Sequence, residues 1–171
     1  LLCGYRIDGF YQLHRDACSV YTISMNETPV DVILKQLASE NPKDRDLVQR
    51  AYEFAKKFHD GQKRYSGEPY LNHLTEVARM LAEIGMSAST VAAGLLHDTI
   101  EDTGATDAEV REQFGEEILF LVQGVTKLGS VRYYGSDRHN ESLRKLFVAT
   151  SQDIRVLIIK LVDRLHNMNT L

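Results

Sequence analysis

Hydrophobic side chains recur at intervals of three and four residues along most of the chain from residue 44 onward. This spacing gathers them on one stripe of an α-helix, whereas a half-buried strand would alternate strictly. The pattern comprises four sets, which are Leu47, Ala51, Phe54, Ala55 and Phe58; Leu74, Val77, Ala78 and Leu81; Val91, Ala92, Leu95 and Leu96; and Ile118, Leu119, Val122 and Val125. We therefore predict a series of packed helices.

A further helix is predicted to begin after Asp153, whose side chain suits an N-cap. Its expected apolar face consists of Ile154, Leu157, Ile158, Leu161, Leu165 and Met168. Asp44 is placed near the start of the first helix, and each proline stands where a helix starts or is absent. Strand signals are poor, so the predicted fold class is all-α. The expected irregular parts are the loops 61–68 and 126–139.

The 171 residues fit one globular domain with a single core. Residues 1–24 lack an initiating Met and show no long periodicity, so we set them apart as a leader of unknown role, with a short strand or hairpin as an alternative. Residues 25–171 form the predicted domain. The helical pattern reaches Leu171 without a cap or stop signal, so we expect this domain to continue beyond it.

Charge and cysteine content narrow the function classes. The formal net charge of −4 argues against a nucleic-acid or membrane-surface binder, although a small anionic ligand needs only a local basic cluster. Two cysteines, Cys3 and Cys18, indicate neither a disulfide framework nor a thiolate zinc site. No apolar run approaches the roughly 20 residues that cross a bilayer. We therefore expect a soluble cytoplasmic protein.

The strongest chemical signal follows the apolar run VAAGLL, where His97-Asp98 is followed by Glu101-Asp102. If one helix continued through them, these side chains would project toward one side. Clustered carboxylates repel one another unless a cation, basic groups or water compensates. An exposed acidic helix end is the alternative interpretation.

Two more polar residues interrupt apolar helices, His73 in PYLNHLTEVA and Asp163 in IIKLVDRLHNM. A core histidine and an ion pair of Asp163 with Lys160 or Arg164 are the simpler explanations. Taken with His97 and Asp98, however, the two residues complete a mixed nitrogen and oxygen set. Such a set suits a divalent metal such as Mn²⁺, Fe²⁺ or Zn²⁺, which can promote phosphate ester hydrolysis.

Four ordered motifs make the chain similar to a known family. They are GQKRYSGEPYLNH at 61–73, LLHDTIEDT at 95–103, GVTKLG at 124–129 and DIRVLIIKLVDRLHNM at 153–168. Over residues 44–171 the sequence resembles the N-terminal hydrolase domain of the RelA/SpoT family, within the HD superfamily. The resemblance implies an HD-domain helical bundle that, in stringent-response signalling, hydrolyses the 3′-pyrophosphate of guanosine tetra- or pentaphosphate (ppGpp or pppGpp) to GDP or GTP and pyrophosphate.

The resemblance also assigns roles to residues. It implies one Mn²⁺ held by His73, His97, Asp98 and Asp163, with Glu101 and Asp102 as the catalytic acidic pair. Substrate contacts would come from Arg64, Ser66, Asn167 and Thr170, of which Asn167 and Thr170 share the helical face of Asp163. An exposed loop arginine is the alternative for Arg64. The loop residues Lys127, Arg132, Tyr133, Tyr134 and Arg138 could cover the pyrophosphate or close over the site, but solvated loop charges are the preferred interpretation of them.

Tyr65, Leu74 and Asn169 depart from the family pattern, in which a basic residue, Pro and Arg are common at these places. No proposed metal ligand is lost, but two positive charges are, and charge-assisted contacts to phosphate are strong. Two alternatives therefore stay open. One is an HD phosphohydrolase of another nucleotide, and the other is a catalytically idle regulatory module of a longer ppGpp synthetase.

Overall fold

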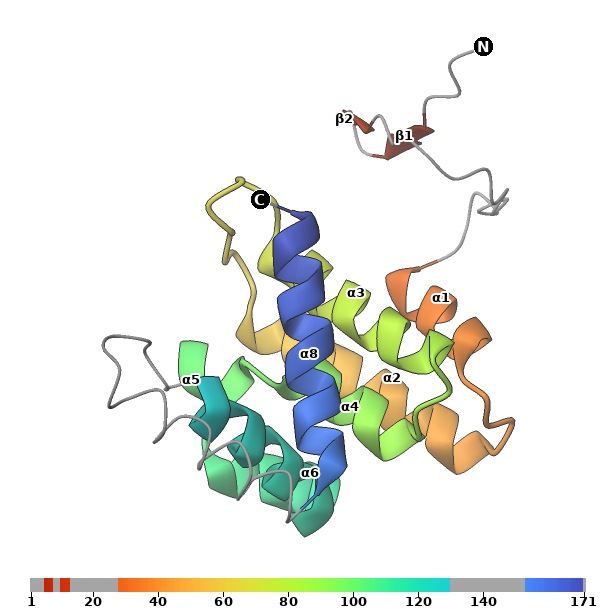
Figure 1. Cartoon of the computed structure of the whole chain (residues 1–171), viewed down its shortest axis with the longest axis vertical. Coiled ribbons are helices and arrows are strands. Elements are labelled where there is room, and N and C mark those ends of the chain that lie inside the picture. The colour runs from red at the N-terminus through yellow and green to blue at the C-terminus, as the bar shows by residue number, and fades with distance from the viewer. Residues whose placement is uncertain (1–4, 8–9, 13–27, 130–152, 171) are drawn as a thin grey trace, which may run out of the picture.

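The computed structural model of the chain describes residues 5–7, 10–12, 28–129 and 153–170 (Figure 1). It confirms the all-α prediction for the body of the molecule. The helices are α1 (Pro29–Gln36), α2 (Pro42–Phe58), α3 (Tyr70–Glu83), α4 (Ala88–Leu96), α5 (Thr99–Asp102), α6 (Asp107–Gly129) and α8 (Ile154–Asn169). Near the N-terminus, β1 (Tyr5–Ile7) pairs antiparallel with β2 (Phe10–Gln12). The rest of the predicted leader lies outside the described residues, and within them no helix is long and apolar enough to cross a membrane.

The first helices begin at proline residues with polar caps. Thr28 precedes α1. Its backbone N–H and its hydroxyl both donate to the carboxylate of Asp31 at 2.7 Å. Asn41 caps α2 by accepting from the N–H of Lys43 at 3.0 Å. The cap of α2 is therefore Asn41, and Asp44 lies in the first turn. Both prolines occupy positions whose N–H would have no partner inside the helix.

Helix α4 is the centre of the fold. All of its residues except Ser89 are buried, and it packs against α2, α3, α6 and α8. Such all-round burial explains why its sequence is apolar without a polar face. Ser87 caps its N-terminus by accepting from the N–H of Thr90. The far end of α4 therefore carries its next residues, His97 and Asp98, into the interior.

One helix does not continue through residues 97–102, so the condition for all four side chains to share one side is not met. Helix α4 ends at Leu96, and α5 starts at Thr99 after Asp98 adopts φ −102° and ψ −5°. The break divides the four polar residues, because His97 is fully buried whereas Glu101 and Asp102 are exposed. A pattern of three- and four-residue spacing continues across such a break, which is why the sequence did not reveal it.

Helix α6 contains a bend that the hydrophobic spacing does not show. Gly115 has φ 85° and ψ 174°, so the segment consists of two helical pieces joined at this glycine. A positive φ of this kind favours a residue without Cβ. The second piece runs to Gly129, so residues 126–129 of the predicted loop are helical. The remainder of that loop lies outside the described residues.

Helix α8 begins as predicted, with Asp153 accepting a hydrogen bond from the N–H of Arg155 at 2.9 Å. Its predicted apolar face is wrong in part. The buried residues are Val156, Ile159, Val162 and Asp163, whereas Ile154, Leu161, Leu165 and Met168 are exposed. Apolar residues surround most of this helix, so periodicity alone could not choose between two stripes.

Close contact between α6 and α8 depends on Gly124. A Cβ added there would lie 2.8 Å and 3.0 Å from the two γ carbons of Val156. We expect Gly124→Ala to lower the free energy of unfolding by about 1 kcal/mol, because overpacking costs about 1–3 kcal/mol and the gain in helix propensity offsets about 1 kcal/mol. Chemical denaturation measures this change.

The same substitution should change sign once its obstacle is removed. In a Val156→Ala background the γ carbons are gone, so Gly124→Ala should stabilise the protein by up to about 1 kcal/mol through helix propensity alone. Equal effects of Gly124→Ala in both backgrounds would contradict the close approach of the two helices.

Candidate metal centre

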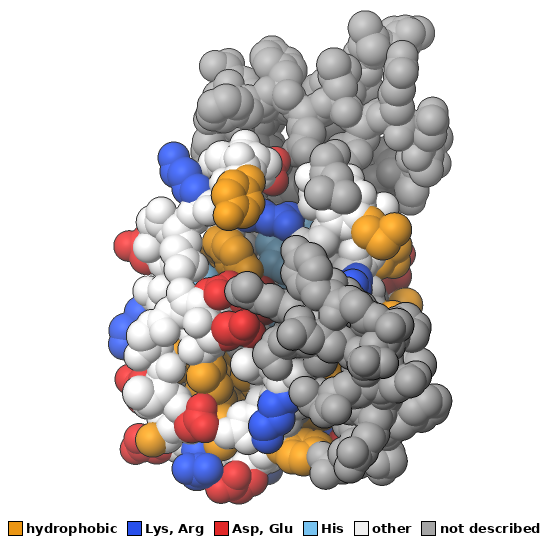
Figure 2. All heavy atoms as spheres, turned by 60° about the vertical axis from the view of Figure 1, so that its left-hand side comes forward, with side chains coloured by type: hydrophobic (Ala, Val, Ile, Leu, Met, Phe, Trp, Pro, Cys, Tyr) orange, Lys and Arg blue, Asp and Glu red, His pale blue; other side chains and the backbone are white. Residues whose placement is uncertain are grey.

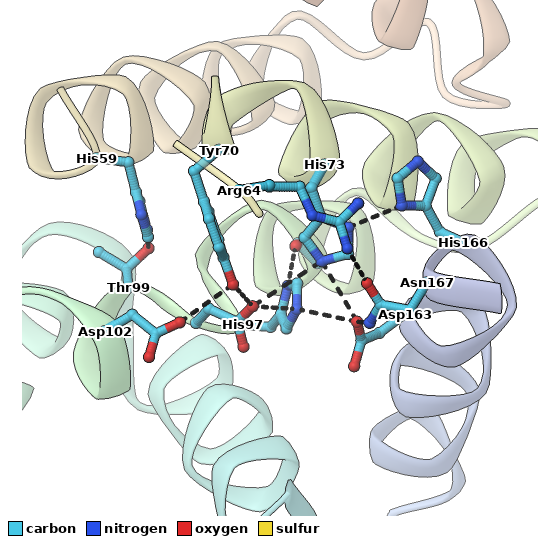
Figure 3. A network of polar contacts seen from close by, with 12 residues as sticks. His59, Arg64, Tyr70, His73, His97, Thr99, Asp102, Asp163, His166 and Asn167 are labelled. Atoms are coloured by element: carbon cyan, nitrogen blue, oxygen red, sulfur yellow. Dashed lines mark hydrogen bonds and ion pairs between the residues drawn. The ribbon is translucent and has the colours of Figure 1, made fainter. Parts of the chain in front are cut away.

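Three helices bring the predicted metal ligands to one place (Figure 3). His73 lies on α3, His97 and Asp98 follow α4, and Asp163 lies on α8. One ligand atom from each of His73, His97 and Asp163 falls within 4.8 Å of the others, and all three residues are buried. Asp98 stands beside the imidazoles, with Oδ2 2.9 Å from Nε2 of His97 and 3.9 Å from Nε2 of His73.

The imidazole of His97 is oriented by the backbone. Its Nδ1 lies 2.8 Å from the carbonyl oxygen of Gly94, which can only accept, so Nδ1 carries a proton and donates. Nε2 is buried, and within the described residues it has no partner of acceptable hydrogen-bond geometry, despite the short distance to Asp98. A buried nitrogen beside carboxylate oxygens, with its other nitrogen held by a carbonyl, is the arrangement of a metal-binding histidine.

Asp163 is surrounded by donors. Its Oδ2 accepts a hydrogen bond from Nζ of Lys160 at 2.7 Å. Its Oδ1 accepts from Nδ2 of Asn167 at 2.7 Å and lies 3.3 Å from Nε2 of His73. The predicted ion pair with Lys160 is thus present together with the contact to the imidazoles. Although burial favours the neutral acid, His73, His97 and Lys160 hold the pKa of Asp163 well below its usual range.

Neighbouring charges also shift the pKa values of His97 and Asp98. Burial disfavours a charged imidazole, but the carboxylates of Asp98 and Asp163 raise the pKa of His97 to about 10. Burial likewise disfavours a charged Asp98, yet His97 and a hydrogen bond from Tyr70 lower the pKa of Asp98 to about 2. The carboxylates are therefore ionised at neutral pH and attract positive charge, which a proton or a divalent cation can supply.

Imidazole nitrogens and carboxylate oxygens at these separations fit a divalent cation. Nε2 of His97 has no hydrogen bond of good geometry with the described residues, and such an ion would satisfy it together with the carboxylates of Asp98 and Asp163. The described residues thus satisfy the chemistry expected of the predicted set His73, His97, Asp98 and Asp163, whose role as ligands stays a prediction.

Tyr70 was not predicted from the sequence, yet it links Asp98 of the centre to Asp102 outside it. Its hydroxyl lies 2.7 Å from Oδ2 of Asp98 and 3.1 Å from Oδ2 of Asp102. Burial and both carboxylates raise the pKa of Tyr70, so the phenol keeps its proton. Its ring stacks on His59, with centroids 5.0 Å apart. Asp102 is thereby connected to the buried residues although it is exposed.

A second support for Asp102 comes from Gln62. Its side-chain amide donates to the carbonyl oxygen of Asp102 at 2.8 Å and accepts from Nδ1 of His59 at 2.6 Å. Nε2 of His59 lies 3.3 Å from the hydroxyl of Thr99 in α5. The start of the 61–69 loop therefore holds α5 in place. Only the position of Gln62 within the first motif gave a sequence signal for this role.

Three of the predicted substrate residues contact one another. Arg64 donates to the hydroxyl of Thr170 at 3.0 Å and to Oδ1 of Asn167. A turn from Arg64 to Gly67, closed by a 2.9 Å backbone hydrogen bond and a positive φ of 86° at Gly67, shapes the loop. The loop 61–69 is thus joined to the end of α8.

Other predicted residues are not brought into these contacts. Glu101 and Ser66 are exposed and make no hydrogen bond or ion pair with the described residues. Lys127 lies on α6, whereas Arg132, Tyr133, Tyr134 and Arg138 lie outside the described residues. Figure 2 shows histidine side chains at the floor of a recess, with basic side chains above it and acidic side chains below.

A model of the HD domain family matches residues 51–171. The chain belongs to the HD domain family. The chain is 48% identical over 147 residues to guanosine-3′,5′-bis(diphosphate) 3′-pyrophosphohydrolase of Aquifex aeolicus, covering 86% of the chain and 21% of that protein. It is 48% identical over 132 residues to GTP pyrophosphokinase of Myxococcus xanthus, covering 75% and 17% respectively. The chain therefore spans about a fifth of the length of these curated relatives.

A solved structure has the same architecture. It is described as a metazoan ortholog of SpoT that hydrolyses ppGpp, and it matches the HD domain with a TM-score of 0.59 at 28% identity. The match covers 72% of this chain and 68% of the other. Together with the named relatives, it confirms the predicted resemblance to the RelA/SpoT family and the predicted HD-domain helical fold.

The raised pKa of His97 predicts how cation binding depends on pH. Because this pKa is about 10, His97 is protonated at neutral pH in the absence of a cation, whereas coordination requires a free Nε2. Cation binding at about pH 7.5 should therefore release a proton, and affinity should rise about tenfold per pH unit as protons become scarcer. Calorimetry in buffers of different ionisation enthalpy counts the protons, and a count of zero would contradict the assignment.

Loss of the Tyr70 hydroxyl should weaken cation binding. Tyr70→Phe keeps the ring on His59 but removes the hydrogen bond to Asp98, and losing such a partner of a ligand typically costs 10–100-fold in metal affinity or activity. Tyr65→Phe is the matched control, because Tyr65 is fully exposed. Chelator competition measures both variants, and equal affinities would show that the hydroxyl does not support Asp98.

Proposed function

We propose that this HD domain is a metal-dependent phosphohydrolase that removes the 3′-pyrophosphate from ppGpp or pppGpp, giving GDP or GTP and pyrophosphate. The observation that carries the proposal is the buried cluster of His73, His97 and Asp163, with Asp98 beside it. The relative from Aquifex aeolicus and the metazoan ortholog of SpoT support the choice of substrate through their described activities.

A divalent cation, Mn²⁺ by family resemblance, would be held by His73, His97, Asp98 and Asp163. Such a cation supplies Lewis acidity to a phosphoryl oxygen and lowers the pKa of water. The chain positions these residues on α3, on the segment after α4 and on α8, so packing among three helices sets their mutual geometry. Burial keeps competing water away from the imidazoles.

The proposed reaction needs proton transfer as well as charge stabilisation. A water oxygen forms a bond to the phosphorus nearest the ribose, and the bond between this phosphorus and O3′ breaks. The water gives up a proton, and O3′ receives one to become the hydroxyl of GDP or GTP. We assign these transfers to the acidic pair Glu101 and Asp102. Asp102 is held beside the cluster through Tyr70, and Glu101 occupies the exposed side of α5.

Nucleotide binding is assigned to Arg64, Ser66, Asn167 and Thr170. A guanidinium can contact phosphate through two N–H groups or stack on a base, and the amide and hydroxyls add hydrogen bonds. The contact of Arg64 with Asn167 and Thr170 supports placing these residues at one site. Ser66 belongs to the turn that carries Arg64.

Several relatives are described as GTP pyrophosphokinases, which favours a second candidate function. In that candidate the HD domain is a catalytically idle regulatory part of a longer synthetase. An HD phosphohydrolase acting on another nucleotide is the nearer variant of the first proposal. Measuring the reaction directly distinguishes the idle module and the other-nucleotide enzyme from the main proposal.

The decisive experiment measures pyrophosphate release from ppGpp by the purified protein with Mn²⁺, with and without EDTA. We expect metal-dependent release. Asp98→Ala and Asp163→Ala should abolish both metal binding and release, because each removes a proposed ligand. Glu101→Ala should keep the metal and lose turnover, because it removes only a proton-transfer group.

The metal content of the variants separates the candidates. No release by folded, metal-loaded protein would favour another nucleotide or the idle module, and release from other nucleotides tested in parallel would distinguish these two. If all three variants kept the metal equally, the ligand assignment would be wrong. Lys43→Ala, on the exposed start of α2, is a control that should keep both metal and turnover.

A further inference from the structure

We propose that His166 is a positioning residue that holds His73 in the tautomer able to bind a cation. The inference rests on the proposed cation site but concerns a residue outside the proposed ligand set. His166 follows Asp163 by three positions on α8, so one helix would supply a ligand and also the support for a ligand on α3.

The contact joins two ring nitrogens. Nδ1 of His73 lies 2.8 Å from Nδ1 of His166, and the ring centroids are 4.9 Å apart (Figure 3). At this distance one nitrogen donates its hydrogen and the other accepts it. A neutral imidazole has one nitrogen of each kind, so the role of Nδ1 in either ring determines the role of Nε2.

When a cation is bound, the opposite side of His73 determines which ring donates. Nε2 of His73 faces the centre, 3.3 Å from Oδ1 of Asp163 and 3.9 Å from Oδ2 of Asp98. A cation bound by Nε2 requires a lone pair there, so the proton of His73 must be on Nδ1. Nδ1 of His166 is then the acceptor, and the proton of His166 is on its Nε2. The pair therefore has only one arrangement compatible with coordination.

His166 would have the same role for His73 as the carbonyl oxygen of Gly94 has for His97, since each accepts a hydrogen bond from Nδ1. The two imidazoles of the cluster would thus each have an acceptor at Nδ1, one from the backbone and one from a side chain. Partners of this kind fix the tautomer and ring orientation of metal-binding histidines, and their loss typically costs 10–100-fold in metal affinity or activity. His73 is buried, so water cannot readily replace His166 as acceptor.

Two substitutions of similar size test the inference. Oδ1 of an asparagine at position 166 can occupy nearly the place of Nδ1 of His166 and accept the hydrogen bond from His73. A leucine there has nearly the same shape as asparagine but no acceptor. His166→Asn should bind Zn²⁺ or Mn²⁺ within a few-fold of the unmodified protein. His166→Leu should bind about 10–100-fold more weakly. Chelator competition without nucleotide measures the affinities, and Asn169→Leu, on an exposed position at the same helix end, is the control.

Nitrogen NMR provides a readout that a purely structural role would not produce. In the Zn²⁺-loaded protein, long-range ¹H–¹⁵N spectra should show a protonated Nδ1 and a metal-bound Nε2 for His73. At a zinc concentration that saturates each variant, the Nδ1 proton signal of His73 should move upfield in His166→Leu, because its acceptor is gone, and should stay in place in His166→Asn. Thermal unfolding identifies any variant that fails to fold. If His166→Leu fails to fold, weak binding by His166→Asn would still contradict the inference.

The outcomes are distinct. Equal affinity of all variants, or an asparagine variant as weak as the leucine variant, would overturn the role of His166 while leaving the cation site intact. If the unmodified protein bound neither Zn²⁺ nor Mn²⁺, the cation site and this inference would both fail. Weak binding by His166→Leu alone, together with the expected NMR signals, would support the inference.

Discussion

Two imidazoles and a carboxylate are buried together between helices whose other buried residues are apolar except for Thr75 and Thr90. Removing ionisable groups from water is costly unless each finds a partner, and this cost constrains the rest of the structure. Helices α3, α4 and α8 must hold fixed positions for the partners to meet. The full burial of α4 and the glycine-dependent approach of α8 to α6 both serve this requirement, because a small displacement would leave a charge without compensation.

The break after α4 gives the centre two different environments. His97 remains in the core, where burial strengthens its electrostatic interactions, whereas α5 turns Glu101 and Asp102 toward solvent. Groups that hold a cation benefit from rigidity and exclusion of water, whereas groups that transfer protons must reach water and substrate. Tyr70 connects the environments with one hydroxyl between two carboxylates. Adjacent residues in the sequence can therefore perform unlike tasks.

Much of the fold was predictable because most helices carry a single apolar stripe. The presence of α2, α3 and α4 follows from that spacing, but their exact ends do not, since Asn41 and not Asp44 caps α2. Helix α8 was harder, because its apolar residues form more than one stripe and burial depends on which one α6 can accept. The break at Asp98 and the bend at Gly115 leave the spacing unchanged, so they required backbone dihedral angles.

The candidate ligands could be predicted because a polar residue in an apolar helix needs a reason to be there, as His73 and Asp163 show. The supporting residues could not. Tyr70, His59 and Gln62 act through distances between segments that are remote in sequence, and an aromatic residue or an amide near a helix start is unremarkable by itself. Tertiary geometry gives them their partners.

The hydrogen bonds from Arg64 to Asn167 and Thr170 have a consequence for ligand entry. The guanidinium is half-buried and already oriented, so a phosphate that bound there as proposed would exchange hydrogen-bond partners and would not have to order a mobile side chain. Asn167 also donates to Asp163. Displacement of Arg64 would release the amide oxygen of Asn167 while its amino group stays on the carboxylate. If Arg64 binds a phosphate as proposed, the amide of Asn167 would be the one side chain between that arginine and the buried Asp163.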